Sequence, residues 1–275
     1  MDLGLKDKTV IITGGSGGIG RGLVLGFAAE GAQVVIATRD GKKAGEVADA
    51  ASELPGKVSV IATDVTDRDA VKQLAEQAER EVGPVDVLVN NAGGVAYPRP
   101  FLEKPRDEAE WEISLNIWGV VHCTEVIGKG MVERGRGSIV NITSNSALAP
   151  EAANMVVHYA GAKGFVMSFS KGLAFEWGPM GVRINCVAPG WIVPWEEDHV
   201  GDGSFWKKYG YEFFGTPEQM AAQAESGELF NVGQQPISRI GRPEDIADAT
   251  LFLASERAVH VTGQLVSVSG GAWMP

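Results

Sequence analysis

Short runs of β-branched residues alternate with longer segments along the whole chain. There are seven such runs: KTVIIT, QVVIAT, KVSVIA, VDVLVN, GSIVNIT, VRINCVA and QLVSVS. The segments between them, DAVKQLAEQAEREVG for example, place apolar residues every three or four positions and end at glycine, as amphipathic helices do. This alternation predicts an α/β fold with one parallel, doubly wound sheet covered by helices on both faces.

The domain organisation follows from the same pattern. No Pro/Ser-rich linker or change of composition divides the chain, so residues 1–275 are predicted to form a single domain. One segment, residues 191–235 between the sixth and seventh runs, is irregular and rich in aromatic side chains. We interpret it as a substrate lid within that domain, with an oligomer contact as the alternative. Its aromatic residues are Trp191, Trp195, Phe205, Trp206, Tyr209, Tyr211, Phe213, Phe214 and Phe230.

Charge and composition exclude several classes of partner. A formal net charge of −11 and a pI near 4.9 argue against nucleic acid or an anionic membrane, both of which require a basic face. No segment reaches 18 uninterrupted apolar residues and the N-terminus lacks a charged leader, so a cytoplasmic protein is expected. Cys123 and Cys186 lie in apolar segments without metal-ligand spacing, which predicts buried, reduced thiols and no metal site.

A glycine-rich stretch, TGGSGGIG, connects the first strand to the following helix. Glycines at such a turn let the backbone approach a pyrophosphate, which the free N–H groups of the helix N-terminus attract. The glycines at 14, 18 and 20 depart from the usual G-x-G-x-x-G spacing, but the position after the first strand predicts a dinucleotide site. The residues expected to contact the cofactor here are Thr13, Gly14, Ser16, Gly18, Ile19 and Gly20.

The end of the second strand selects between the nicotinamide cofactors. An acid there binds the ribose 2′-hydroxyl, whereas an arginine accommodates a 2′-phosphate. Here the strand ends at Thr38 and Arg39, which favours NADP over NAD. In the alternative interpretation Arg39 is a solvated charge and Asp40 binds the ribose. At the end of the third strand, Asp64 and Val65 are expected to frame the adenine.

Polar clusters follow the fourth and fifth strands, where ligands of open α/β sheets gather. The fourth strand ends in NNAG, which contributes Asn91, Ala92 and Gly93 as expected cofactor contacts. The fifth ends in NITSNSA, which contains Ser144 and Ser146. Turn formation by the asparagines and loop capping by the serines are the structural alternatives.

The stretch HYAGAK places Tyr159 and Lys163 one helical turn apart, a spacing that alone indicates only a shared helix face. Together with the preceding motifs and APG, however, it resembles the short-chain dehydrogenase/reductase family over essentially residues 5–271. The resemblance implies a Rossmann-type sheet in the order 3-2-1-4-5-6-7. It also implies a catalytic tetrad of Asn116, Ser144, Tyr159 and Lys163, and further cofactor contacts from Tyr159, Lys163, Pro189, Gly190 and Ile192.

The chemistry of the tetrad can be argued independently. Hydride transfer at an alcohol carbon needs a group that removes the hydroxyl proton and returns it on reduction. A tyrosine, with a pKa of about 10, is too weak a base, but a lysine ammonium at ~4–5 Å would lower that pKa by about two to three units. Ser144 would donate a hydrogen bond to the reacting oxygen. Ser146 is the alternative, because Ser144 precedes Tyr159 by 15 residues, about two more than is usual in the family.

The aromatic segment favours a hydrophobic, alicyclic or aromatic secondary alcohol or ketone, with an acid or CoA ester as a variant. The expected substrate contacts are Ser146, Val95, Trp191 and Trp195. A dehydratase or epimerase, or a non-catalytic dinucleotide sensor, are the alternatives.

Assembly is inferred from the resemblance alone. The helices expected at about 107–134 and 155–178 carry apolar residues such as Trp111 and Trp118, and they resemble the four-helix contact of the family. This implies a homotetramer or a dimer. The resemblance also implies that Asn116 holds a water that links Lys163 to solvent.

Overall fold

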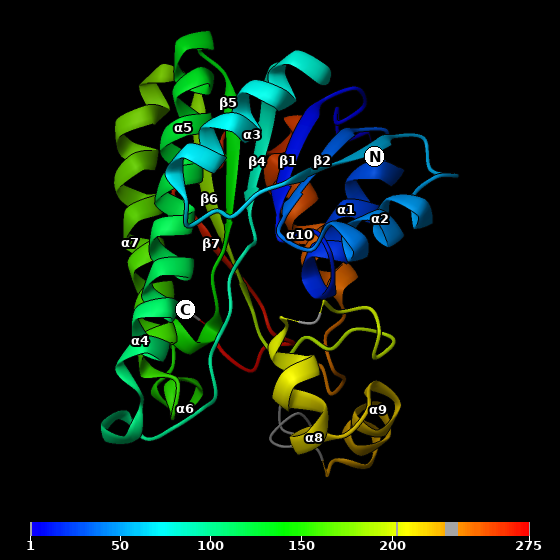
Figure 1. The fold of residues 1–275 in the computed structure, drawn as a ribbon, viewed down its shortest axis with the longest axis vertical. Coiled ribbons are helices and arrows are strands. Elements are labelled where there is room, and N and C mark those ends of the chain that lie inside the picture. Colours follow the sequence, from blue (N-terminus) through cyan, green and yellow to red (C-terminus); the bar gives the residue numbers. More distant parts are fainter. Residues whose placement is uncertain (1, 202, 229–235, 275) are drawn as a thin grey trace.

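The seven predicted strands form one parallel sheet in the order β3-β2-β1-β4-β5-β6-β7, which confirms the predicted fold (Figure 1). The computed structural model describes residues 2–201, 203–228 and 236–274. Each strand lies within the run that predicted it or extends it by a residue or two. The strands are β1 Thr9–Thr13, β2 Gln33–Thr38, β3 Lys57–Ala62, β4 Val85–Asn90, β5 Gly137–Ile142, β6 Val182–Pro189 and β7 Leu265–Val268.

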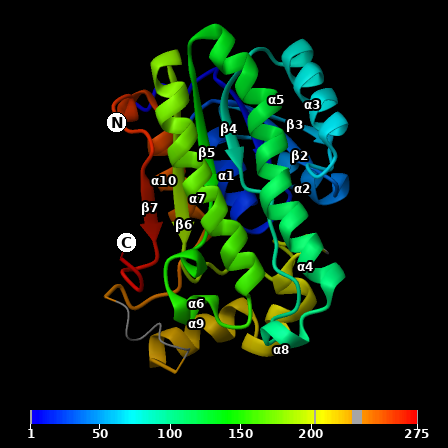
Figure 2. The same ribbon diagram turned by 90° about the vertical axis from the view of Figure 1, so that its left-hand side faces the viewer.

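Helices cover both faces of the sheet, as Figures 1 and 2 show. Helices α1, α2 and α10 pack on one face, and α3, α5 and α7 pack on the other. The helices are α1 Gly18–Ala29, α2 Gly41–Ala50, α3 Arg68–Glu81, α4 Arg106–Ile113, α5 Gly119–Arg134, α6 Pro150–Ala153, α7 Val157–Trp177, α8 Tyr211–Phe214, α9 Pro217–Ser226 and α10 Pro243–Ala254.

The core lies in two layers, one on each face of the sheet. Successive side chains of a strand point to opposite faces, so Val10 and Ile12 enter one layer and Ile11 the other. All three are completely buried. The strands are nearly continuous apolar runs in the sequence because helices cover both faces of the sheet. Cys123 and Cys186 are free and buried, as predicted.

The helix expected at 107–134 is interrupted. Helix α4 ends at Ile113, a π-helical turn occupies Ser114–Trp118, and α5 begins at Gly119. The side-chain amide of Asn116 donates to the carbonyl oxygen of Glu112 at 2.8 Å, so a backbone acceptor in this turn is satisfied by a side chain. The second expected helix, 155–178, is α7.

Residues 191–201 and 203–228 form a lobe at the carboxyl ends of the strands, with α8 and α9 at the lower end of the molecule in Figures 1 and 2. Its aromatic rings mainly contact one another: Trp191 packs edge-to-face on Trp206 and Phe214. Phe230 lies outside the described residues. Among the helices in the described part of the chain, none is long and apolar enough to span a membrane.

Candidate active site

A cavity of about 550 Å³ opens at the carboxyl ends of the strands. It extends from the glycine turn after β1, past the end of β2, to the residues that follow β4, β5 and β6. Most residues expected at a cofactor site line it: Gly14, Ser16, Gly18, Ile19, Gly20, Thr38, Arg39, Asp64, Val65, Asn91, Ala92, Gly93, Tyr159, Lys163, Pro189, Gly190 and Ile192. Residues that are far apart in the sequence therefore meet in one hollow.

The glycine turn is shaped by close backbone packing. Gly14 has a φ of +66°, which side-chain-bearing residues rarely adopt, and a Cβ on Gly20 would collide with the carbonyl oxygen of Gly14. Asn91 secures the turn from β4, because its Nδ2 donates to the carbonyl oxygens of Thr13 and Gly14 at 2.9 and 3.0 Å. The turn is thus tied to the NNAG motif by side-chain hydrogen bonds.

Thr13 does not line the cavity, contrary to its expected role as a cofactor contact. It is 1% exposed, and its Oγ1 accepts hydrogen bonds from the backbone N–H groups of Asn91 and Ala92 at 3.0 and 2.9 Å. Thr13 therefore joins β1 to β4 beneath the site. Its position at the strand end was predicted correctly, but the direction of its side chain was not.

At the end of β2, Arg39 and Asp40 have different surroundings. The Arg39 side chain is 62% exposed and lies 3.8 Å from the carboxylate of Asp64. Asp40 caps α2, because its Oδ1 accepts from the N–H of Lys43 at 3.0 Å. Burial opposes ionisation of Asp64, but hydrogen bonds from Thr66 and the charge of Arg39 lower its pKa overall. The cation at this end of the cavity is thus close to the acid expected to frame the adenine.

Tyr159 and Lys163 lie on one face of α7, with the Lys163 ammonium 5.6 Å from the centre of the tyrosine ring. Lys163 is 3% exposed, and its Nζ donates to the carbonyl oxygen of Ile142, the last residue of β5, at 2.9 Å. Burial lowers the pKa of Lys163 to about 8. The hydrogen bond to the end of β5 thus fixes the ammonium of Lys163 at the cavity wall.

The pKa of Tyr159 differs from the expectation. Burial raises this pKa, the hydrogen bond with Ser144 acts against the rise, and the charge of Glu112 adds to it. The predicted lowering is therefore wrong for this structure, because removing the phenolate from water outweighs the hydrogen bond with Ser144, which favours the charged form.

The two candidate serines are hydrogen-bonded to each other. The N–H and the Oγ of Ser146 both donate to Oγ of Ser144, at 3.1 and 2.9 Å. Ser144 lines the cavity and bonds Tyr159, whereas Ser146 is not among the lining residues. The geometry favours Ser144 as the serine that meets a reacting oxygen, with Ser146 behind it.

Asn116 is completely buried beside Lys163. Its Nδ2 donates to the carbonyl oxygen of Gly94 at 2.7 Å, and its Oδ1 accepts from the N–H of the same residue at 3.2 Å. A Cβ on Gly93 would lie 2.8 Å from Asn116 Oδ1 and 2.9 Å from Lys163 Nζ. Gly93 is therefore packed between two members of the expected tetrad.

The other end of the cavity is apolar. Val95 and Trp191 line it as expected, together with Trp111, Leu115, Phe205 and Trp206. Trp195 does not: it is 53% exposed, stacks on the guanidinium of Arg242 and donates from Nε1 to Glu244. Its ring thus lies against the start of α10 and not at the cavity wall, and its assignment as a substrate contact stays a prediction.

Two charged residues beside the site, Lys104 and Glu112, were not predicted from the sequence. Lys104 Nζ lies 2.8 Å from Glu112 Oε1, and both side chains are almost fully buried. One signal for Glu112 was available: it precedes Asn116 by four residues, the spacing that places two side chains on the same helix face. Trp111, for which an oligomer contact was expected, lines the cavity and is 37% exposed.

The lobe contacts the glycine turn directly. The N–H of Gly18, at the start of α1, donates to the carbonyl oxygen of His199 at 2.7 Å. A Cβ on Gly17 would lie 2.8–3.0 Å from backbone atoms of residues 199–201. Residues 199–201 therefore cover the turn at which a pyrophosphate is expected.

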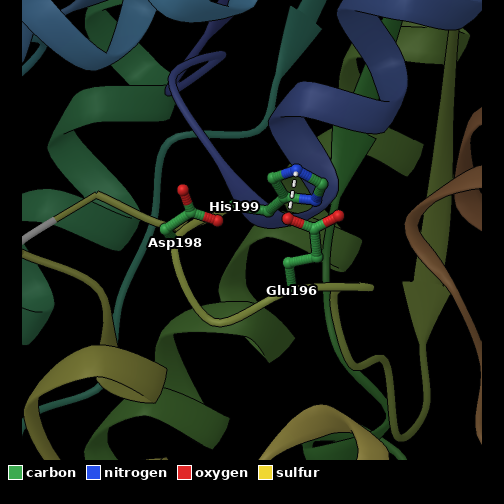
Figure 3. A group of neighbouring side chains, drawn as sticks. All are labelled: Glu196, Asp198 and His199. Carbon is green, nitrogen blue, oxygen red and sulfur yellow. Dashed lines mark ion pairs between the residues drawn. The ribbon is translucent and has the colours of Figure 1, made fainter.

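Three side chains near this contact have potential metal ligands: Glu196, Asp198 and His199 (Figure 3). Their ligand atoms lie within 4.8 Å of one another, and the His199 ring is 3.7 Å from the carboxylate of Glu196. We assign no ion to this group, because both acids are exposed and solvated acidic clusters need no metal. The grouping was not predicted from the sequence.

Comparisons with known proteins identify the family of the chain. The family model described as short chain dehydrogenase matches residues 8–195, and that of enoyl-(acyl carrier protein) reductase matches residues 214–272. A 3-oxoacyl-(acyl-carrier-protein) reductase of Thermotoga maritima is 33% identical over 97% of this chain and 98% of its own length. The 7alpha-hydroxysteroid dehydrogenase of Escherichia coli is 32% identical over 98% and 96%. A Beutenbergia cavernae crystal structure, described with NADP bound at low occupancy, has a TM-score of 0.80 at 29% identity and covers 98% of both chains. The chain belongs to the short-chain dehydrogenase/reductase family of NAD(P)-dependent oxidoreductases.

Proposed function

We propose that the protein interconverts a hydrophobic secondary alcohol and its ketone, with Tyr159 as the general acid and base and NADP as the preferred cofactor. The observation that carries the proposal is the meeting of Tyr159, Ser144 and Lys163 in the cavity that begins at the glycine turn. The relatives share the reaction class; the assignment of roles to residues is our inference.

The cavity suits a dinucleotide because the glycine turn at the N-terminus of α1 lines it, with residues 199–201 packed over that turn. When bound, a nicotinamide cofactor supplies the hydride acceptor or donor. Ser144 donates to the substrate oxygen and so stabilises the charge that develops there. Tyr159 takes the hydroxyl proton in oxidation and returns it in reduction. Lys163, held by the Ile142 carbonyl, favours the phenolate when it is charged, and Asn116 links it to solvent through a water.

The preference for NADP is supported by the different contacts of Arg39 and Asp40, the two charged residues that follow β2. The guanidinium of Arg39 is exposed at the cavity edge, where it can meet a 2′-phosphate. Asp40, the acid that could instead bind a ribose hydroxyl, uses one oxygen to cap α2. This supports the phosphate-binding interpretation over the ribose-binding one.

The substrate class is supported by the apolar side chains of the cavity lining, among them Trp111, Trp191 and Trp206. Such walls favour a ring system over a linear polyol. One relative acts on a hydroxysteroid, a polycyclic alcohol, and another on an acyl chain carried by a protein. We favour the cyclic class and propose residues 191–235 as its lid.

For assembly we propose a homotetramer. Trp118, Phe165 and Phe175 are exposed on α7 and on the turn between α4 and α5, at 52%, 41% and 90%. Apolar side chains gathered on two long helices are typical of a subunit contact. Light scattering during gel filtration measures the assembly, and a monomeric mass would overturn this proposal.

An absorbance assay at 340 nm tests the function. NADPH and NADH are offered with alicyclic, aromatic and acyclic ketones, and the matching alcohols with the oxidised cofactors. We expect turnover of cyclic ketones with NADPH, and loss of the NADPH preference by about tenfold or more in Arg39→Ala, since a charge-assisted hydrogen bond is lost. Turnover unaffected by Tyr159→Phe would refute the proposed role of the tyrosine, and an unchanged preference in Arg39→Ala would refute that of Arg39.

A further inference from the structure

Lys104 and Glu112 form a buried ion pair that the proposed chemistry does not use. Their side chains are 2% and 0% exposed, with Nζ and Oε1 2.8 Å apart, and Glu108 lies 3.7 Å from the same ammonium. Removing two charges from water is costly, so a buried pair is weak evidence for a stabilising role. Its contacts indicate a different role.

Both charges bind the backbone of the segment that follows β4. Glu112 Oε1 accepts from the N–H of Ala96 at 2.7 Å, and Lys104 Nζ donates to the carbonyl oxygen of Tyr97 at 3.1 Å. Residues 91–96 have neither helical nor strand structure. Backbone groups of such a segment need partners when they are shielded from water, and here the ion pair supplies them.

The same segment is a wall of the candidate site. Gly94 is held by both polar atoms of the Asn116 side chain, and Val95 lines the cavity. Tyr97 packs edge-to-face on Tyr209 of the lobe, with ring centres 5.1 Å apart. The segment thus runs from the tetrad to the proposed lid, and Lys104 and Glu112 fix it midway.

Glu112 also contacts the candidate site through its main chain. Its backbone carbonyl accepts from Asn116 Nδ2, so one residue holds the wall with its side chain and the π-helical turn with its main chain. Its charge also contributes to the raised pKa of Tyr159. Substituting its side chain should therefore loosen the wall, whereas its main-chain carbonyl continues to accept from Asn116.

We propose that Lys104 and Glu112 are positioning residues, which hold residues 94–97 as a rigid wall against which the substrate ring is oriented toward Ser144 and Tyr159. This proposal rests on the proposed function for its kinetic consequence. The structural consequence, which is the ordering of residues 94–97, is independent of the proposed function.

The test uses the double variant Lys104→Met with Glu112→Gln, because removing both charges avoids leaving one buried without a partner. The introduced amide keeps an oxygen for the Ala96 N–H, whereas the Tyr97 carbonyl loses its donor. We expect KM for a cyclic ketone to rise about tenfold, as for loss of a hydrogen bond from a charged group, with kcat and cofactor affinity changed by less than about threefold. The matched control is Glu110→Gln on the same helix, whose pair with Arg106 is exposed and should not affect KM.

Hydrogen exchange followed by mass spectrometry supplies a readout without turnover. We expect the peptide covering residues 94–103 to exchange faster in the double variant, and the peptide covering residues 13–20 to be unchanged. A folded double variant with wild-type exchange in residues 94–103 overturns the proposal, as does one with wild-type KM. If the wild-type protein turns over no ketone or alcohol, the proposed function fails, and the exchange result alone decides the role of the pair.

Discussion

Gly93→Ala tests whether the tetrad is assembled as the structure indicates. The new Cβ would lie 2.8 Å from Asn116 Oδ1 and 2.9 Å from Lys163 Nζ, whereas ordinary contacts begin at 3.4 Å. Both atoms would have to retreat by about half an ångström, which is the tolerance within which catalytic groups must be held. Neither can retreat freely, because Asn116 is bonded to Gly94 and Lys163 to Ile142.

The expected result is a fall in kcat of about 10- to 100-fold, or about 2 kcal/mol of transition-state stabilisation, because displacements of this size misalign the proton-transfer groups. Cofactor affinity, measured by fluorescence titration, should change much less. The control is Gly45→Ala in α2, where a Cβ meets nothing within 4 Å. It should leave kcat unchanged and stabilise the fold by about 0.5–1 kcal/mol. A folded Gly93→Ala enzyme with wild-type kcat would show that Asn116 and Lys163 are not positioned through this contact.

Three further predictions concern single substitutions. Tyr159→Phe should lower kcat at least about 100-fold while cofactor binding persists, since only the proton-transfer group is lost; comparable losses of both would contradict this. Because burial lowers the pKa of Lys163 to about 8, the folded state loses this proton before the unfolded chain does, so wild-type stability relative to Lys163→Met should rise between about pH 8 and 10.5 in denaturant titrations. A difference that stays flat over that range would rule out a depressed pKa. Gly17→Ala should displace residues 199–201 and speed cofactor release in stopped-flow fluorescence; an unchanged release rate would argue against contact between this segment and the bound cofactor.

The fold could be predicted from the sequence because local pattern and global architecture agree. Strands buried on both faces are apolar throughout, and the helices between them carry one apolar stripe. Position along a parallel sheet then brings the glycine turn, the end of β2 and the motifs after β4 and β5 to one edge. The strand order alone predicts that these segments meet, which explains why most predicted cofactor residues line the cavity.

Side-chain direction could not be predicted in the same way. Thr13 and Trp195 stand at the expected positions, but one points into the sheet and the other toward Arg242. Burial could not be read from the sequence either: the desolvation that raises the pKa of Tyr159 depends on how the folded chain packs around its ring. For the same reason the sequence did not single out Lys104 and Glu112, whose side chains are buried only in the folded chain.

The π-helical turn at Ser114–Trp118 has a consequence for how this chain can vary. Such a turn contains one more residue than an α-helical turn, and each residue of an α-helix rotates the chain by about 100°. Deleting one residue here would leave α5 packed on the sheet but rotate α4 about its axis, which would carry Trp111 off the cavity wall and Glu112 away from the N–H of Ala96. Apart from Leu115, which lines the cavity, and Asn116, which belongs to the proposed tetrad, residues of this turn should therefore tolerate substitution more readily than a change of length. The extra residue thus sets the rotation of α4, which carries a cavity-lining residue, relative to α5, which packs on the sheet.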